Sequence, residues 1–293
     1  MSRTRLGLTG LASSLLLVVG LLGLVAAPAS ASTEAAPVRH SDCTTPLTST
    51  QRAALLQASD TRTLRTFADA KARLDVIEST FSATRDHRGI FAIFYRQILV
   101  SGAGPVSDAS RWQYPTWVER VSRNFVVAYL DNLRGYLTGG TMTREWRSYY
   151  AMASDCNRSV GRVAAEGLIA HLVIDFPEAI RLANTRVAQQ QDFFAIGDLL
   201  VDATVGLTAD VERVYGQDLS PLFRLFWFGD AVDLLAGTPI ITPVFFQAVR
   251  LSAWVDGLML NDWFLATGTR WSMRTKFLAA ETALDSMETF HLI

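Results

Sequence analysis

The chain has 293 residues and a formal net charge of −1, and 49% of its residues are apolar. Removing residues 1–31, which hold two basic residues and no acidic ones, would leave 25 basic against 28 acidic residues, a net charge of −3. This balance argues against a nucleic-acid partner, because proteins that bind nucleic acids normally carry an excess of Arg and Lys on one face.

The N-terminal segment has the order of residue types found in secretory signal peptides. Arg3 and Arg5 precede an apolar run from Leu15 to Ala27 that is interrupted only by glycines, and small residues follow in Ala29-Ser30-Ala31. No basic cluster follows the run to hold it in a membrane as a stop-transfer helix. We therefore predict that residues 1–31 are a signal peptide, cleaved after Ala31, and that the mature protein is secreted and has no integral membrane span.

Residues 32–60 are predicted to form an extended N-terminal arm, because the stretch from Ser32 to Gln57 is rich in Pro, Ser, Thr and Ala. The arm contains Cys43, and Cys156 is the only other cysteine. An even number of cysteines in a secreted protein predicts a disulfide, which would pin the arm near the middle of the domain. A reactive thiol is the alternative, although neither cysteine lies in a C-x-x-C motif.

Hydrophobic periodicity predicts that residues 61–293 form a single all-α domain of about eight to ten helices. Between Val118 and Tyr136, apolar residues recur at steps of three and four, as in an amphipathic helix. Similar spacing occurs in residues 61–84, 90–100, 160–174 and 273–287. Gly and Pro predict helix breaks at residues 101–115, 138–143, 175–177, 216–221, 237–243 and 268.

Several catalytic signatures are absent from the sequence. It contains no H-E-x-x-H, no Walker loop, no G-x-S-x-G and no dinucleotide-binding fingerprint. Zincins, P-loop enzymes and ordinary serine hydrolases are therefore disfavoured, and attention moves to polar residues within apolar surroundings.

The first such cluster is Arg85-Asp86-His87-Arg88, directly before an apolar helical pattern. Asp86 is expected to cap that helix, and His87 lies at its start. Tyr95 extends from the same helix and would line a polar pocket. His87 and Tyr95 are thus candidate catalytic residues that contact substrate; the alternative is a cap followed by an amphipathic helix.

The second cluster is His171 and Asp175, four residues apart among apolar neighbours. On a continuous helix both side chains would lie on one face, within reach of one hydrogen bond or one metal ion. Asp198 and Asp202 are also four residues apart. If the two helices are neighbours, one imidazole and three carboxylates would suit a divalent metal such as Zn, Mn or Fe with a bound water.

A purely structural interpretation of the second cluster remains open. Asp175-Phe176-Pro177-Glu178 also fits a capping box, with Asp175 as the N-cap of a new helix and Pro177 in its first turn. In that case one helix ends near Ile174, and His171 is a buried histidine bonded to a backbone carbonyl. A metal-free polar or catalytic pocket is a third alternative.

Residues 222–249 are rich in aromatic side chains, including Trp227 and Phe245. Charged residues and prolines interrupt this segment within the thickness of a bilayer, which disfavours a membrane span. We predict a buried helical hairpin; the alternative is a set of exposed aromatic side chains that bind a small molecule or a lipid-like ligand. The same choice applies to three later tryptophans, which we expect to lie mostly in the core: Trp254, Trp263 and Trp271.

The segment A-H-x-x-x-D-F-P, together with D-H-R-G-I-F-A-x-x-Y-R upstream, resembles an uncharacterised family of bacterial helical proteins, domain of unknown function 5995. In that family we expect a core close to A-H-I-N-x-D-L-P. His171, Asp175 and Pro177 match this pattern, whereas Val173 replaces the Asn and Phe176 the Leu; Asp192 would correspond to an Asp further downstream. The resemblance would span about residues 85–265, implies a helical fold, and carries no known reaction.

Two functional hypotheses follow from these observations. In the first, the protein is a secreted hydrolase, metal-dependent or not, in which His171 and Asp175 bind a metal or act as a base and its orienting carboxylate. In the second, it is a non-catalytic secreted protein that binds a ligand or a partner, and the polar pair only joins two helices.

Overall fold

A computed structural model of the protein describes residues 43–202, 204–220, 222 and 242–293. Every regular element in these ranges is a helix and no β-strand occurs in them, which confirms the predicted all-α fold. The signal peptide, most of the N-terminal arm and most of the aromatic segment around Trp227 lie outside the described residues.

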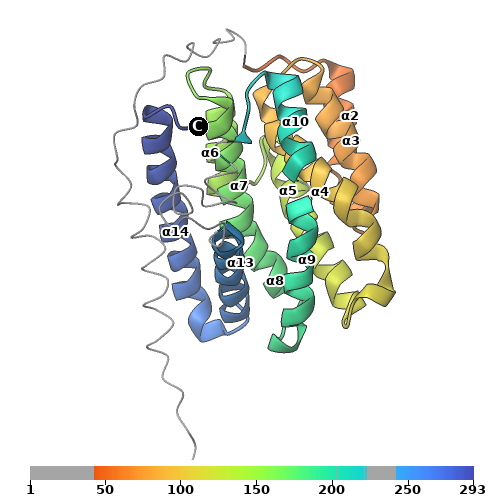
Figure 1. Ribbon diagram of the computed structural model, residues 1–293. Helices are drawn as coiled ribbons and strands as arrows, with labels where there is room; N and C mark the ends of the chain where they lie inside the picture. Colours follow the sequence, from red (N-terminus) through yellow and green to blue (C-terminus); the bar gives the residue numbers. More distant parts are fainter. Residues whose placement is uncertain (1–42, 203, 221, 223–241) are drawn as a thin grey trace, which may run out of the picture.

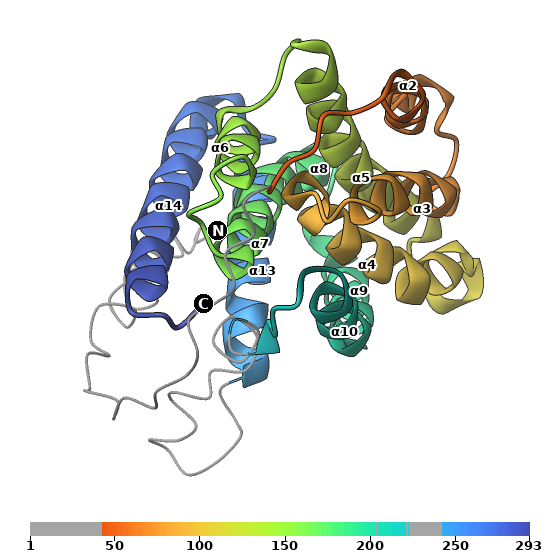
Figure 2. The same ribbon diagram turned by 90° about the horizontal axis from the view of Figure 1, so that it is seen from above.

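The helices form two groups that share one core. Figure 2 shows α6, α7, α13 and α14 on one side and α2, α3, α4, α5, α9 and α10 on the other. Their bounds are α2 Ser49–Ala58, α3 Asp69–Ser82, α4 Ile90–Ser107, α5 Pro115–Thr138, α6 Arg144–Ala153, α7 Val160–Ile169, α8 Phe176–Leu182, α9 Gln190–Asp202, α10 Thr204–Tyr215, α13 Thr242–Met259 and α14 Trp263–Thr289.

Helix α4 is the central element of the core. Its first six residues, Ile90 to Tyr95, are all buried, so the helix is covered by neighbours on every side. It contacts α3, α5, α7, α9 and α10. Within the described chain, residues 87–107 form one stretch that is long and apolar enough to cross a membrane, and more than half of it is buried inside the protein.

The N-terminal arm is partly helical, contrary to the prediction of an extended segment. Thr48 caps α2 through a capping box in which its hydroxyl accepts from the Gln51 N–H and the Gln51 side chain accepts from the Thr48 N–H. Leu55 is fully buried and joins the core. The capping signal is readable in the sequence, but the high Pro, Ser and Thr content of the flanking residues concealed it.

Cys43 and Cys156 form a disulfide, as predicted, with an S–S distance of 2.07 Å and a sequence separation of 113. The bond fixes the start of the described chain to the loop between α6 and α7. A disulfide is compatible with an extracellular location, because such bonds persist mainly in oxidising compartments.

Two further sequence predictions are wrong. Gly268 does not end a helix, because α14 runs through it without a break from Trp263 to Thr289. Trp254 is buried as expected, but Trp263 and Trp271 are exposed, at 83% and 71% of their full accessible surface. Apolar residues at helical spacing are found both on a buried helix face and on one that no other helix covers. The spacing therefore could not predict that Trp263 and Trp271 are exposed.

Candidate functional site

His171 and Asp175 lie on a π-helical segment, Ala170–Asp175, that joins α7 to α8 without interruption. The Phe176 N–H donates to the His171 carbonyl five residues earlier, which is the π-helical bond. Pro177 follows directly, and a proline ring presses on the carbonyl four residues before it in a regular α-helix. The wider turn therefore lies where this helix must accommodate Pro177.

The capping-box interpretation of Asp175 is wrong. Asp175 has helical backbone angles, φ −72° and ψ −37°, and its side chain makes no capping hydrogen bond. Because the chain stays helical through Asp175, the side chains of His171 and Asp175 lie on one face of the helix, as predicted. The His171 Nδ1 and Asp175 Oδ2 atoms are 2.9 Å apart.

A third residue, Trp146 on α6, completes a hydrogen-bonded triad. Its indole Nε1–H donates to the same Asp175 Oδ2 at 2.7 Å. All three side chains are buried, His171 at 2% exposure and Trp146 at 0%. Because the same Asp175 oxygen already accepts from the indole, we assign the proton of the imidazole contact to His171 Nδ1, which leaves a lone pair on Nε2. That Nε2 is buried and has no hydrogen-bond partner in the described part of the chain.

Aromatic rings surround the imidazole of His171. Phe125 on α5 stacks on it with centroids 3.6 Å apart and an interplanar angle of 11°. Tyr95 and Phe91 on α4 meet it edge-on at 4.8 and 5.1 Å. This burial lowers the pKa of His171 and outweighs the raising effect of Asp175. The imidazole is therefore held in its neutral form at neutral pH.

Phe125 is the most accessible of these rings, since it is only partly buried while Phe91, Tyr95 and Trp146 are in the core. Phe125 also stacks on Phe176 at 4.6 Å and lies tilted against Tyr95 at 6.0 Å. Rotation of the Phe125 side chain is therefore the most direct way to expose His171 to solvent.

Tyr95 lies beside His171, as the sequence analysis proposed for a site residue. Burial and the charge of Asp175 raise its pKa well above the usual value, so the hydroxyl stays protonated and is able to donate. Its oxygen is buried without a partner among the described residues, and so is that of Tyr129, whose ring lies 5.8 Å from that of Tyr95. The hydroxyl groups of Tyr95 and Tyr129 are thus polar groups within the aromatic surroundings of His171.

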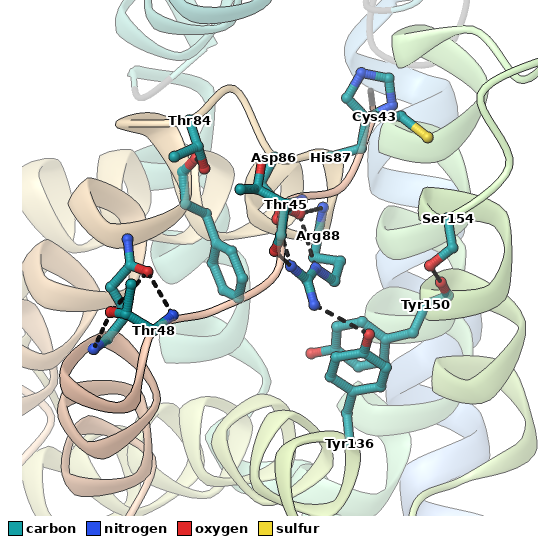
Figure 3. Close-up of polar contacts among 12 residues, drawn as sticks. Cys43, Thr45, Thr48, Thr84, Asp86, His87, Arg88, Tyr136, Tyr150 and Ser154 are labelled. Carbon is teal, nitrogen blue, oxygen red and sulfur yellow. Dashed lines mark hydrogen bonds and ion pairs between the residues drawn. The ribbon is translucent and has the colours of Figure 1, made fainter. Parts of the chain in front are cut away.

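His87 belongs to a different cluster, shown in Figure 3. Asp86 caps the short helix that precedes α4, as predicted, and accepts hydrogen bonds from the Thr45 and Arg88 N–H groups and the Arg88 guanidinium. Arg88 also donates to the Thr45 carbonyl at 2.6 Å and to the Tyr136 hydroxyl at 3.3 Å.

The side chain of His87 packs edge-on against Tyr215 at 5.6 Å, and its backbone N–H donates to the Cys43 carbonyl at 2.8 Å. The cluster therefore attaches the disulfide-bonded segment to the start of α4. These contacts are those of a structural clamp.

The predicted metal set is not assembled from the residues that the structure describes. These residues contain no group of three or more His, Cys, Asp or Glu side chains arranged to hold a metal ion. Asp198 is exposed on α9, and its charge raises the pKa of the buried Arg250 against the lowering effect of burial. The side chain of Asp202 lies outside the described part, so its place in the set stays a prediction.

Trp146 and Phe125 are site residues that the sequence alone does not reveal. Phe125 lay within a predicted apolar stripe, and nothing in the sequence near Trp146 indicates a partner for Asp175. Asp192 is buried and accepts from the backbone N–H groups of Gln113 and Tyr114 at 3.1 and 2.7 Å, so it fixes the start of α5.

Comparison with known proteins identifies the family but no activity. No curated protein and no solved structure matches the chain. Residues 67–283, which include α3 to α10, α13 and most of α14, match a family described as a family of unknown function. The protein is therefore a member of the DUF5995 family.

Proposed function

We propose that the protein is a secreted hydrolase in which His171 is the general base and Asp175 orients it. The observation that carries this proposal is the buried Nδ1 to Oδ2 hydrogen bond of 2.9 Å, which leaves the His171 Nε2 lone pair without a partner in the described chain. A neutral imidazole oriented by a carboxylate is a common arrangement for removing a proton from a nucleophile.

In the proposed reaction, Nε2 of His171 removes a proton from a water molecule while the water oxygen forms a bond to the electrophilic centre of the substrate. The bond between the electrophilic centre and the leaving group then breaks, and the His171 imidazolium gives its proton to the leaving group. Asp175 stabilises the imidazolium that forms in between, and the Trp146 N–H keeps the carboxylate in place. The Tyr95 hydroxyl stays protonated and supplies a donor for the oxygen that develops negative charge.

Secretion is part of the same proposal. The disulfide between Cys43 and Cys156 and the signal-like residues 1–31 support it. Expression with and without residues 1–31, followed by mass determination of the exported protein, tests it. We expect export only of the full chain and a mature N-terminus at Ser32.

A metal-dependent version uses the same lone pair. His171 Nε2 would bind a divalent ion such as Zn, Mn or Fe, and Asp202 of α9, whose side chain lies outside the described residues, would be the further protein ligand. Elemental analysis of the purified mature protein tests this version: it requires nearly one metal per chain, lost in His171→Ala at unchanged helical content. If metal-free protein has full activity, the metal-dependent version is rejected, and the version in which His171 acts as a general base without a metal remains.

The alternative is a non-catalytic protein in which the triad only braces the core. One observation favours this alternative: the hydrogen bond from Trp146 to Asp175 links the π-helical segment to α6, and this link would stabilise the fold whether or not the protein catalyses a reaction. In that case the function lies in binding a small molecule, a lipid-like ligand or a partner elsewhere on the surface.

A substrate screen with matched variants separates the two functions. Chromogenic esters, phosphate esters, glycosides and peptide amides are offered to the wild type, to His171→Gln and to His291→Gln, a change in the exposed C-terminal tail. We expect hydrolysis of one class, reduced by about 10² to 10⁴-fold in His171→Gln and unchanged in the control. Equal rates in all three proteins would assign the triad to bracing.

A second test needs no substrate. Diethyl pyrocarbonate acylates neutral, accessible imidazoles, and peptide mapping reports the modification of each histidine separately. We expect slow modification of His171 in the wild type and severalfold faster modification in Phe125→Ala, because Phe125 covers the ring. An unchanged rate would show that Phe125 does not control access to His171.

A further inference from the structure

We propose that one end of the bundle, formed by the α13–α14 turn and the loop after α8, docks on an anionic lipid membrane. The two segments are joined by a hydrogen bond of 3.3 Å from the Asn261 amide to the Thr185 carbonyl. Figure 1 shows both at the lower end of the molecule. We call this end, with its exposed side chains Leu182, Val187, Trp263, Phe264 and Leu265, the aromatic end.

The apolar side chains of the aromatic end are unusually accessible. Trp263 and Phe264 are 83% and 76% exposed, and their rings contact each other edge-on at 4.9 Å. Asp262 caps α14 through the Phe264 N–H, which fixes the two rings at the start of the helix. Contiguous exposed apolar groups mark interaction sites, and Trp and Phe are the residue types that enter the membrane interface.

A polar cavity of about 880 Å³ opens at the same end of the molecule, and its lining includes Asn261, two residues before Trp263. It is lined by the start of α5, the loop after α8 and Asn261, and it includes the arginines Arg120 and Arg186 but no carboxylate side chain. Side-chain amides such as those of Asn184 and Gln189 complete its wall. Guanidinium groups bind phosphate well, and amides donate to phosphate and hydroxyl oxygens. The cavity therefore suits the head group of an anionic phospholipid.

Charge complementarity distinguishes a membrane from a purely apolar occupant. Arg181 and Arg270 both pair with the single carboxylate of Glu178, at 2.6 and 2.9 Å, so these three side chains together carry a net charge of +1. With Arg120 and Arg186 added, and with the exposed N-cap Asp262 counted against them, the charged side chains named at this end have a net positive charge around a protruding apolar tip. Anionic lipid surfaces attract such residues, while the tip enters the region between head groups and acyl chains.

Vesicle co-sedimentation tests the proposal with the disulfide-bonded mature protein. The probes are vesicles of phosphatidylcholine alone and of phosphatidylcholine mixed with phosphatidylglycerol, at physiological salt. We expect binding to the mixed vesicles at least about tenfold stronger than to the neutral ones. The double variant Trp263→Ala/Phe264→Ala should lose on the order of tenfold or more in affinity, and Arg186→Ala should reduce the preference for anionic vesicles.

The matched control is Phe290→Ala. Phe290 is 73% exposed and lies just past the other end of α14, about 40 Å from Trp263 along the helix axis, so its removal should leave vesicle binding unchanged. Equal binding to both vesicle types, or full binding by the Trp263/Phe264 variant, would overturn the proposal. Complete displacement of the protein from the vesicles by inorganic phosphate would also overturn it, because the cavity would then bind a free anion. A concentration-dependent dimer that the double variant abolishes would overturn it too, because the aromatic end would then bind a second copy of the chain.

Discussion

The oxygen Oδ2 of Asp175 is the residue-scale feature on which the candidate site depends. It accepts from both the His171 imidazole and the Trp146 indole, so the buried charge is paired with two donors. A buried carboxylate without partners would be strongly unfavourable, and one that accepts two hydrogen bonds is tolerated. The polar pair is therefore stable among aromatic rings only because α6 supplies Trp146.

The stability of the protein should depend on the protonation of His171. Its pKa is lowered in the folded state by burial, so the unfolded chain binds a proton more readily. The contribution of His171 is therefore complete above its ordinary pKa of 6.5 and is lost as the pH falls through its lowered folded value. In His171→Gln, which keeps an amide donor for Asp175, this loss should disappear. Urea unfolding of the wild type and of His171→Gln between about pH 5 and about pH 8 measures this loss of stability. The same pH profile in both proteins would contradict the prediction.

A second titrating residue, Glu281 on α14, acts in the opposite direction. Burial and the charge of Glu166 raise its pKa from 4.5 to about 7, so the folded state holds a proton that the unfolded chain releases. Its stabilising contribution is present below its ordinary pKa and is lost as the pH rises through about 7. Glu281→Gln should remove that decline in the same unfolding series. The Glu281→Gln variant is also the background in which the effect of His171 on stability is measured alone. If stability still declines with rising pH in Glu281→Gln, Glu281 does not cause that decline.

At the scale of elements, close helix packing around the site depends on glycine. A Cβ atom at Gly167 on α7 would lie 2.8 Å from the Phe91 ring and 3.1 Å from the Tyr149 ring, and both rings are buried. Gly167→Ala should destabilise the protein by about 1–3 kcal/mol through overpacking.

The matched control for this prediction is Gly102→Ala on α4, where a Cβ would meet nothing within 4 Å. This change should be neutral or stabilise the protein by about 0.5–1 kcal/mol, because alanine loses less conformational freedom in a helix than glycine. Midpoints of chemical denaturation measure both variants. Equal effects of the two changes would show that α7 does not approach α4 as closely as described.

At the scale of the whole molecule, the disulfide closes a loop of 113 residues that contains α2 to α6. In the chain-entropy account, a crosslink of this span stabilises the folded state by about 4–5 kcal/mol. We expect Cys43→Ser/Cys156→Ser to lose a stability of that order, and reduction of the wild type to give the same loss. Reduction should leave the double variant unchanged. A loss well below 1 kcal/mol would show that the Asp86–Arg88 clamp alone holds the N-terminal segment.

Local features of the fold and the site were predictable, and non-local ones were not. The helical class, the pairing of the two cysteines and the proximity of His171 to Asp175 follow from composition and from spacing along one helix. Trp146 and Phe125 could not be found this way, because residues 25 and 46 positions before His171 reach it only through the packing of α5 and α6 against the π-helical segment. The break expected at Gly268 did not occur, because a single glycine costs a long helix little when its neighbours are packed.

The sequence by itself determined that this chain is helical, carries one crosslink and holds an imidazole one turn from a carboxylate, because each of these depends on neighbours along the backbone. Only the tertiary structure decided that the imidazole lies beneath Phe125, with an Nε2 that has no hydrogen-bond partner among the described residues, and that Trp263 and Phe264 face outward while Trp254 lies in the core. Apolar spacing shows which residues share a face of a helix. Which faces are covered is decided by the packing of helices that are distant in sequence.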